Sequence, residues 1–204
     1  LQIHQEWLIH HIEASPGFIY PDYRRNEVLG FLKNNLLEDL CMTRPAARLN
    51  WGIPLPFDPA YVTYVWFDAL TNYISTLGWP EQGGNFEKFW TNGFVLQTAG
   101  KDQVRFQSLM WQAMLISAGV KATDTVFYHG FITSGGQKMS KSLGNVISPY
   151  DLVTKYGTDA TRYLLLRHVH PFEDSDVTWE RLDECYTSNL VNGLVNLVAR
   201  VMKL

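Results

Sequence analysis

The spacing of apolar residues at the start of the chain predicts two helices. In residues 1–14, Leu8 and Ile12 lie on one face, and Ser15-Pro16-Gly17 then breaks the helical pattern. Asn26 is predicted to cap the second helix, because asparagine accepts hydrogen bonds from the first turn. The first fifty residues are therefore predicted to be mainly helical.

Shorter apolar runs predict alternating strands and helices in the middle of the chain. Residues 61–67 are predicted to form a strand or to begin the helix that carries Tyr73. A buried strand is predicted at 93–98, a helix at 103–118 and another strand at 125–131. This order is typical of a parallel βαβ unit with a right-handed crossover, so the sequence predicts the α/β class.

After residue 131 the pattern becomes helical. Gly135-Gly136 predicts a turn, and Ser148-Pro149 and Thr158-Asp159 each predict the start of a helix. The character of the sequence changes at residues 171–177. From Thr178 onward apolar residues recur at helical spacing, which predicts one long amphipathic helix.

Composition limits the classes of function. The chain has 204 residues, 46% hydrophobic and 18% charged, which argues against disorder. A net charge of −3 excludes a uniformly basic nucleic-acid coat, although it leaves room for a local basic patch. No apolar run predicts a membrane span.

The possible metal ligands and thiols are sparse. Cys41 and Cys185 lie far apart, so neither a disulfide framework nor a zinc site is predicted, and a reducing cytoplasm is expected. His4, His10 and His11 lack a third ligand at a useful spacing, and no metal site is predicted from them.

The strongest chemical signal lies in the glycine-flanked loop at residues 135–145. Lys138 and Lys141 are three residues apart, and each lies beside a serine. Lysine ammonium groups suit phosphate oxygens, and serine hydroxyls and loop amides add donors. The loop is interpreted as a mobile clip for a polyphosphate; the alternative is a solvated surface loop.

Lys138-Met139-Ser140-Lys141-Ser142 is identical to the KMSKS signature of class I aminoacyl-tRNA synthetases, and the resemblance covers nearly the whole chain. Within that class the chain resembles the methionyl-tRNA synthetase family. The segments that carry this second resemblance are Ile19–Val28, Trp51–Pro54, Tyr64–Ala69, Ala99–Asp102 and His129–Thr133.

The resemblance implies an architecture. Residues 1–50 would be the tail of the connective insertion, and residues 51–172 would be the second half of a Rossmann-like parallel-sheet domain with the KMSKS loop. Residues 173–204 would begin the helical anticodon-binding bundle. The family's HIGH signature is absent and would lie upstream of Leu1, as would the zinc knuckle of many members.

The resemblance also implies roles for individual residues. Lys138 and Lys141 would be catalytic. The ATP-binding residues would be Lys138, Met139, Ser140, Lys141 and Ser142, together with His129, Gly130, Asp102 and Arg44. The amino-acid pocket would contain Trp66, Tyr73, Phe106, Gln107 and Trp111, whose aromatic edges suit a thioether.

Three observations complicate this picture. Gln107 occupies a position where many family members have a histidine, so a role that depends on titration is in doubt. Phe106 and Trp111 are five residues apart, a spacing that one face of an α-helix does not hold squarely. Glu173, Asp174 and Asp176 form an acidic run, interpreted as a solvated domain junction.

The implied function is ATP-dependent activation of methionine and its transfer to tRNA(Met), with Mg²⁺ on the triphosphate and no membrane partner. These 204 residues alone are not expected to form the adenylate. Two alternatives remain: a KMSKS synthetase for leucine, isoleucine, valine or cysteine, or a non-catalytic module that binds tRNA or associates with another chain.

Overall fold

The computed structural model describes residues 1–49, 51–81 and 83–203. The chain divides into two compact units, Leu1–Tyr128 and His129–Leu204. Each unit has its own elements and its own apolar core. They are described separately below.

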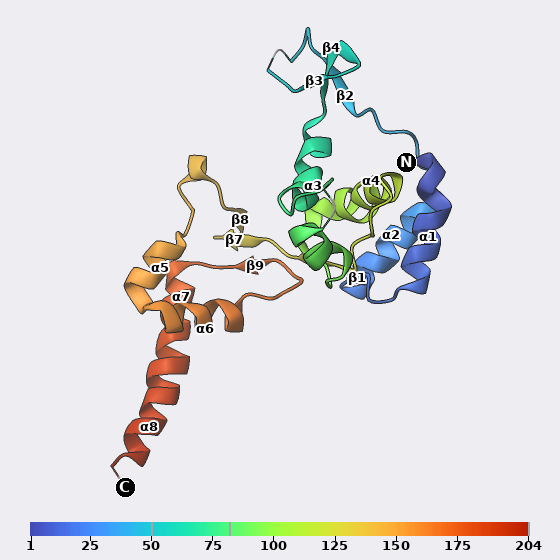
Figure 1. Ribbon diagram of the computed structural model, residues 1–204. Coiled ribbons are helices and arrows are strands. Elements are labelled where there is room, and N and C mark those ends of the chain that lie inside the picture. The colour runs from blue at the N-terminus through green and yellow to red at the C-terminus, as the bar shows by residue number, and fades with distance from the viewer. Residues whose placement is uncertain (50, 82, 204) are drawn as a thin grey trace. The chain divides into compact units, whose positions relative to one another are not determined.

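The first unit mixes helices with short strands (Figure 1). Its strands are β1 (Ile19–Tyr20), β2 (Thr43–Pro45), β3 (Pro54–Leu55), β4 (Asp58–Thr63), β5 (Leu96–Gly100) and β6 (Thr125–His129). Its α-helices are α1 (Gln5–Ala14), α2 (Asp22–Asn34), α3 (Val65–Ser75) and α4 (Trp111–Ser117). The 3-10 turns η1 (Gln2–His4) and η3 (Lys101–Gln103) and the π-helical segments η2 (Phe86–Thr91) and η4 (Phe106–Met110) complete it.

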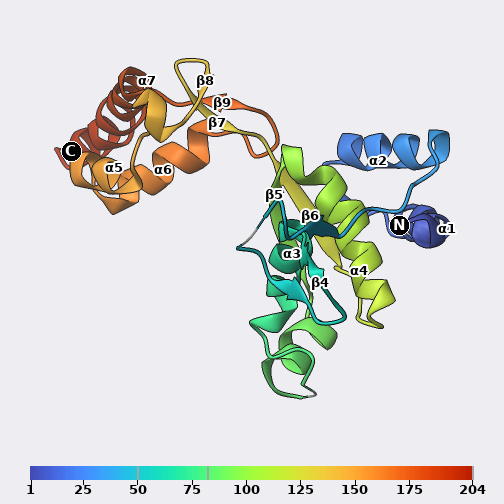
Figure 2. The same ribbon diagram turned by 90° about the horizontal axis from the view of Figure 1, so that it is seen from above.

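A three-stranded sheet in the order β1-β6-β5 forms the centre of this unit, and Figure 2 shows β5 and β6 beside each other. β1 pairs with β6 in parallel, with Ile19 opposite Val126. The connection from β5 to β6 runs through η4 and α4, as the predicted βαβ alternation requires. The predicted α/β class with a parallel sheet is confirmed.

The helices α1 and α2 share a core with this sheet. Leu8, Ile12, Leu32 and Val126 are almost completely buried in it. Removing such apolar surface from water is the main force that holds helices and sheet together. Tyr128 in β6 is buried beside them, and its hydroxyl lies 2.6 Å from the Ser108 hydroxyl; the burial raises the pKa of Tyr128.

The second predicted helix is present, but it begins earlier than predicted. α2 starts at Asp22, after Pro21 in extended conformation, and Asn26 lies inside the helix rather than at its cap. The backbone N–H of Arg24 donates to the Pro21 carbonyl at 2.9 Å. The negative charge of Asp22 is stabilised at the positive N-terminal end of the helix dipole, which favours this start. Asn26 lies beyond the first turn and cannot cap the helix.

The strands β2, β3 and β4 form a separate antiparallel sheet in the order β2-β4-β3. β2 and β3 each pair with β4, so the segments around Arg44 and Pro54 are joined through this strand. Both interpretations of 61–67 apply, because β4 ends at Thr63 and α3 begins at Val65.

The strand predicted at 93–98 begins at Leu96 and is buried on one face only. Gln97 and Ala99 are buried, whereas Leu96 is 55% exposed. The predicted burial thus holds for one face of β5 only. The apolar character of Leu96 did not indicate that its side chain lies on the exposed face.

The second unit contains one small sheet and several helices. Its strands are β7 (Ile132–Ser134), β8 (Gln137–Lys138) and β9 (Ser175–Asp176), in the order β8-β7-β9. Its helical elements are the 3-10 turn η5 (Lys141–Leu143), α5 (Pro149–Tyr156), α6 (Thr158–His168), α7 (Trp179–Cys185), the π-helical η6 (Tyr186–Val195) and α8 (Asn196–Val201). Leu152, Leu164, Val177 and Leu182 form its core.

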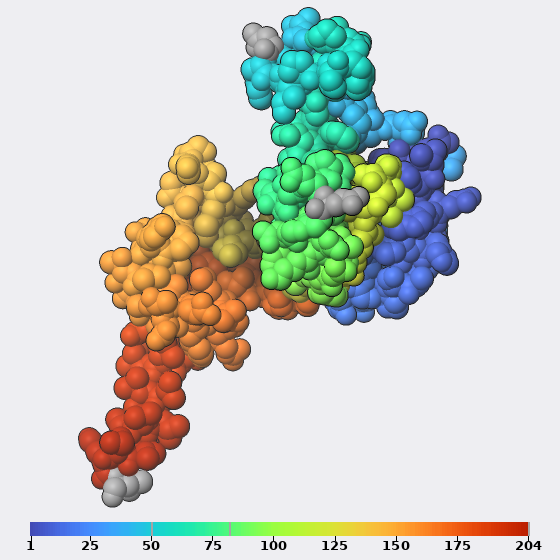
Figure 3. Space-filling view, in the orientation of Figure 1, coloured from blue at the N-terminus to red at the C-terminus, as the bar shows by residue number. Residues whose placement is uncertain are grey.

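The helix starts predicted in this unit are confirmed. The Ser148 hydroxyl accepts from the Tyr150 N–H, and Pro149 occupies the first turn of α5. The Thr178 hydroxyl caps α7 by accepting a hydrogen bond from the Arg181 N–H. α7, η6 and α8 follow one another without a break, and the segment is coloured red in Figure 3. Leu194, Leu197 and Val201 in this segment are all more than half exposed.

The predicted domain limits at residues 50 and 172 follow the family's organisation and remain predictions. The division after Tyr128 separates two spatially compact units and does not test those limits. In the described part of the chain, no helix is long and apolar enough to cross a membrane.

Candidate functional site

The lysine–serine loop follows a tight hairpin. β7 and β8 pair antiparallel, with Thr133 opposite Lys138, and the predicted turn at Gly135-Gly136 has φ values of 63° and 73°. Side chains with a Cβ avoid this region, so glycine suits both positions. Lys138 ends β8 with its side chain exposed, and its ammonium lies 5.2 Å from the centre of the Phe131 ring.

Hydrogen bonds within the loop define the next turn. The Ser140 hydroxyl accepts from the Leu143 N–H at 3.2 Å, and the Ser140 N–H donates to Asn145 Oδ1 at 2.9 Å. Asn145 also donates to the Lys138 carbonyl at 3.4 Å. Lys141 and Ser142 are left exposed at the tip. The turn thus presents a mobile cation on an ordered backbone, which is suited to an anionic ligand.

Two aspartates anchor this hairpin from a distant part of the sequence. Asp176 Oδ1 accepts from the Thr133 hydroxyl at 3.0 Å and from the Gly136 N–H at 2.8 Å. Asp174 Oδ1 accepts from the Phe131 N–H at 2.9 Å. Besides lying in the predicted solvated junction, Asp174 and Asp176 therefore make specific hydrogen bonds that the sequence interpretation did not include. Their partners lie 40 to 43 positions away along the chain, and no local signal in the sequence marked them.

Gly130, an expected ATP-binding residue, has a clear structural role. A Cβ at this position would overlap the backbone carbonyl of Glu173 and lie 2.7 Å from the Asp174 nitrogen. Only glycine permits this approach of two backbone segments. The neighbouring His129 is exposed, and its Nδ1 lies 2.8 Å from the Gly130 carbonyl oxygen.

The structure brings the five expected pocket residues together in the first unit. Trp66 stacks on Phe106 with ring centres 4.5 Å apart, and Tyr73 lies 5.8 Å from Trp111. Trp66 and Tyr73 are two turns apart on α3, whereas Phe106 and Trp111 belong to the stretch from η4 into α4. Aromatic side chains from two helical elements thus face one another.

The expectation that one face of an α-helix does not hold Phe106 and Trp111 squarely does not apply here, because the helix is not α-helical between them. The Trp111 N–H donates to the Phe106 carbonyl, a bond between residues five apart that defines a π turn. Such a turn contains more residues than an α-helical turn, so it rotates positions five apart toward the same side. Nothing in the sequence marked this π turn, and the expectation assumed a regular α-helix.

Gln107 lies in the same turn and is 3% exposed. Its Nε2 donates to the Tyr73 hydroxyl at 3.0 Å. Gln107 Oε1 and Trp111 Nε1 are buried and have no hydrogen-bond partner among the described residues. A buried acceptor and a buried donor without partners are costly, and they mark positions where a ligand's polar atoms would be favoured.

Asp102 and Arg44 lie in separate elements of the first unit. Asp102 follows β5 in the turn η3, is exposed, and accepts from Gln103 Nε2 at 3.3 Å. Arg44 lies in β2, donates to the Thr43 carbonyl at 2.7 Å, and places its guanidinium 4.3 Å from the Tyr64 ring centre. The stacking leaves part of the guanidinium fork for another partner.

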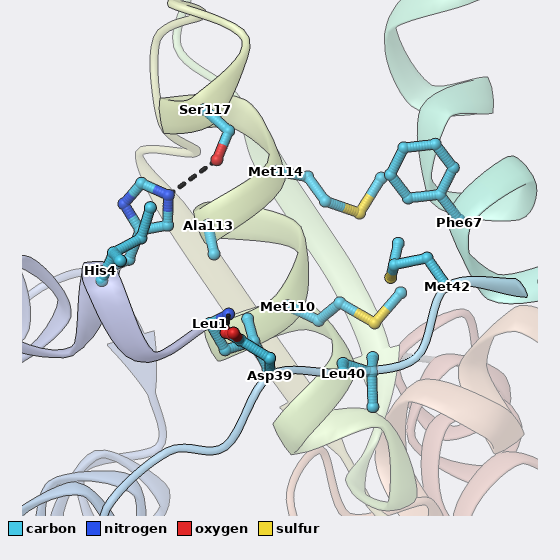
Figure 4. Close-up of a pocket in the computed structure, with 11 residues that line it drawn as sticks. Leu1, His4, Asp39, Leu40, Met42, Phe67, Met110, Ala113, Met114 and Ser117 are labelled. Carbon is cyan, nitrogen blue, oxygen red and sulfur yellow. Dashed lines mark hydrogen bonds and ion pairs between the residues drawn. The ribbon is translucent and has the colours of Figure 1, made fainter. Parts of the chain in front are cut away.

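A separate cavity of about 340 Å³ lies beside α4, and Figure 4 shows the side chains that line it. Its apolar wall contains Met42, Met110, Met114 and Phe67, and His4 Nε2 lies 2.7 Å from the Ser117 hydroxyl at one edge. None of the five expected pocket residues lines this cavity. It is therefore distinct from the Trp66–Phe106 cluster.

Metal ligands do not gather in the residues that the structure covers. Within 1–49, 51–81 and 83–203 there is no group of three or more His, Cys, Asp or Glu side chains that could hold a metal ion. Cys41 is exposed, and its hydrogen bonds with Thr43, aided by Arg44, lower the pKa of its thiol.

Known proteins resemble this chain over almost its full length. A methionine–tRNA ligase from Fusobacterium nucleatum subsp. nucleatum is 47% identical over 195 residues, which cover 96% of this chain and 30% of that protein. A methionine–tRNA ligase from Rhizobium meliloti strain 1021 is 42% identical over 205 residues, covering 100% of this chain and 39% of that protein. The chain thus spans between 30% and 39% of these two relatives.

Solved structures agree with these relatives. The Mycobacterium tuberculosis methionyl-tRNA synthetase in complex with methionyl-adenylate superimposes with a TM-score of 0.86 at 38% identity, over 98% of this chain and 38% of that one. The family profile described as tRNA synthetases class I (M) matches residues 1–202. The expected resemblance is confirmed, and this chain belongs to the family of class I tRNA synthetases of the methionine type.

Proposed function

We propose that the protein to which this chain belongs is a methionine–tRNA ligase, which activates methionine with ATP and transfers it to tRNA(Met). The carrying observation is the ordered turn that presents Lys141 beside Lys138 at the end of a hairpin. Membership of the methionine family supports the choice of amino acid. A cytoplasmic location is proposed with it.

The proposed chemistry has two steps. The methionine carboxylate attacks the α-phosphorus of ATP, and the bond to pyrophosphate breaks. A ribose hydroxyl of the tRNA 3′ end then attacks the activated carbonyl, and AMP leaves. Mg²⁺ is proposed to accompany ATP, coordinated through phosphate oxygens.

Lys138 and Lys141 would act on the first step. Negative charge builds on the leaving pyrophosphate, and an oriented ammonium stabilises it more in the transition state than in the bound substrate. Met139, Ser140 and Ser142 would shape the turn, and Ser142 would add a hydroxyl donor. His129, Gly130, Asp102 and Arg44 are proposed as further ATP-binding residues.

The cluster of Trp66, Tyr73, Phe106, Gln107 and Trp111 is proposed to hold the methionine side chain. Sulfur is polarizable and makes favourable contacts with aromatic edges. Because Gln107 donates to the Tyr73 oxygen, the Tyr73 proton is free to be donated to a weak acceptor such as a thioether.

The test is ATP–pyrophosphate exchange by the full-length protein with methionine, leucine, isoleucine, valine and cysteine in turn. Methionine alone is expected to drive exchange. If another of these amino acids drives it and methionine does not, the specificity is wrong. Binding of tRNA without any amino-acid-dependent exchange would instead support the non-catalytic module.

A further inference from the structure

The π turn of the proposed methionine pocket is held from behind by a buried glutamine. Gln112 is 0% exposed, yet its amide is fully bonded. Nε2 donates to the Gln107 carbonyl at 2.9 Å and to the Thr123 hydroxyl at 3.1 Å. Oε1 accepts from the Thr123 N–H at 3.1 Å. The side chain thus joins the turn to the segment that precedes β6.

The backbone fixes the orientation of this amide. The Thr123 N–H can only donate and the Gln107 carbonyl can only accept, so Oε1 and Nε2 of Gln112 cannot be exchanged. The Thr123 hydroxyl gives its single proton to Gln97 Oε1 at 2.8 Å. Its oxygen therefore accepts from Gln112. A buried chain of hydrogen bonds runs from Gln112 through Thr123 to Gln97.

This chain meets the pocket at Gln107. Gln112 holds the backbone carbonyl of Gln107, and the side chain of the same residue donates to the Tyr73 hydroxyl. A π turn is rare and departs from regular α-helical bonding, and Gln112 bonds to a backbone carbonyl within it. Holding the backbone at residue 107 therefore determines where its amide can reach.

We propose that Gln112 and Thr123 are positioning residues for methionine recognition. They fix the π turn so that Gln107 holds Tyr73 in one orientation, and neither needs to touch the substrate. The inference rests on the proposed function, since it assigns the cluster around Tyr73 to the amino acid.

The test compares Thr123→Val with Thr123→Ser in the full-length protein. Valine has nearly the shape of threonine but lacks the hydroxyl, whereas serine retains it. Methionine-dependent ATP–pyrophosphate exchange is measured below the unfolding temperature of each variant. Thr123→Val is expected to raise the KM for methionine roughly 3- to 10-fold, the value of about one neutral hydrogen bond. The KM for ATP should stay constant, and Thr123→Ser should behave as wild type.

A double-mutant cycle with Tyr73→Phe separates positioning from general destabilisation. If the chain acts through the Tyr73 hydroxyl, Thr123→Val should add nothing to the methionine KM of Tyr73→Phe. Full addition of the two effects, or equal rises in KM for methionine and ATP, would overturn the inference. If Thr123→Val does not fold, Gln112→Met takes its place in the cycle with the same expectations.

The wild-type control separates a failure of the proposed function from a failure of the positioning role. Exchange that does not respond to methionine in the wild type contradicts the proposed function. Methionine-dependent exchange in the wild type with identical kinetics for Thr123→Val and Thr123→Ser contradicts only the positioning role.

Discussion

The side-chain amide of Gln107 donates a hydrogen bond of 3.0 Å to the hydroxyl of Tyr73. An amide has no titration near neutral pH, so this contact persists where a histidine would change its charge. The proposed recognition of methionine through Tyr73 should therefore be insensitive to the charge state of residue 107 across neutral pH.

Gln107→His should introduce a pH dependence. A histidine with a pKa of about 6.5 would become charged in an apolar pocket as the pH falls. We expect the KM for methionine of this variant, relative to wild type, to rise below about pH 6.5. Exchange kinetics between pH 5.5 and pH 8 would measure this, each about one to one and a half units from that pKa.

Gln107→Leu provides the matched control. It removes the hydrogen bond without adding a titrating group, so KM should rise roughly 2- to 10-fold at every pH. A constant ratio between Gln107→His and wild type across the pH range would show that residue 107 does not face the bound amino acid.

Gly130→Ala should destabilise the second unit. The added methyl group would overlap the Glu173 carbonyl, and such overpacking costs about 1–3 kcal/mol. Gly30→Ala is the control, because no atom lies within 4 Å of a Cβ built at Gly30 inside α2. That variant should gain about 0.5–1 kcal/mol from helix propensity. Urea unfolding of both variants measures the difference, and similar stabilities would refute the close approach.

Asp176→Ala should loosen the hairpin that leads to Lys138. It removes the acceptor for the Thr133 hydroxyl and the Gly136 N–H, with an expected loss of about 1–3 kcal/mol in unfolding free energy. Asp176→Asn keeps an oxygen acceptor and should lose less than half as much. Urea unfolding followed by exchange kinetics tests both. An asparagine variant as unstable as the alanine variant would mean that charge, rather than the shared acceptor, holds the hairpin.

The Cys41 thiol should react faster than Cys185 with iodoacetamide. Its pKa is lowered by hydrogen bonds with Thr43, so a larger fraction is thiolate at a given pH, and thiolate is the reactive form. Mass spectrometry of the two labelled peptides over pH 6.5–9, a range around the ordinary value of about 8.5, gives both rates. Cys41 should reach half of its maximal rate at a lower pH than an unstructured cysteine peptide; the opposite order would contradict the contact.

Features set by neighbouring residues were predictable from the sequence. Ser148 before Pro149 and Thr178 before α7 carry the capping chemistry of helix starts, and Gly135-Gly136 carries that of a tight turn. The alternation of strand and helix patterns around β5 and β6 also predicted the α/β class. The periodicity of apolar residues indicates the type of each element and which of its faces is buried.

Features that depend on distant partners were not predictable. Asp176 bonds to residues 40 and 43 positions away, and Gln112 to a threonine 11 positions away. The π turn at Phe106 places side chains where regular helical spacing does not. The candidate residues themselves came from the family resemblance. Only the structure shows their arrangement, in which Trp66 stacks on Phe106 and Gln107 donates a hydrogen bond to Tyr73.

The most direct test of the proposed function is single-turnover formation of methionyl-adenylate by the full-length protein and its Lys141→Ala variant. We expect the rate to fall roughly 30- to 1,000-fold, equivalent to about 2–4 kcal/mol, with methionine affinity nearly unchanged. Lys155→Ala is the control, because this exposed lysine of the same unit pairs with Asp183 at 2.7 Å. An equal loss of methionine affinity in Lys141→Ala, or an equal fall in rate for Lys155→Ala, would contradict the assignment of Lys141 to the triphosphate.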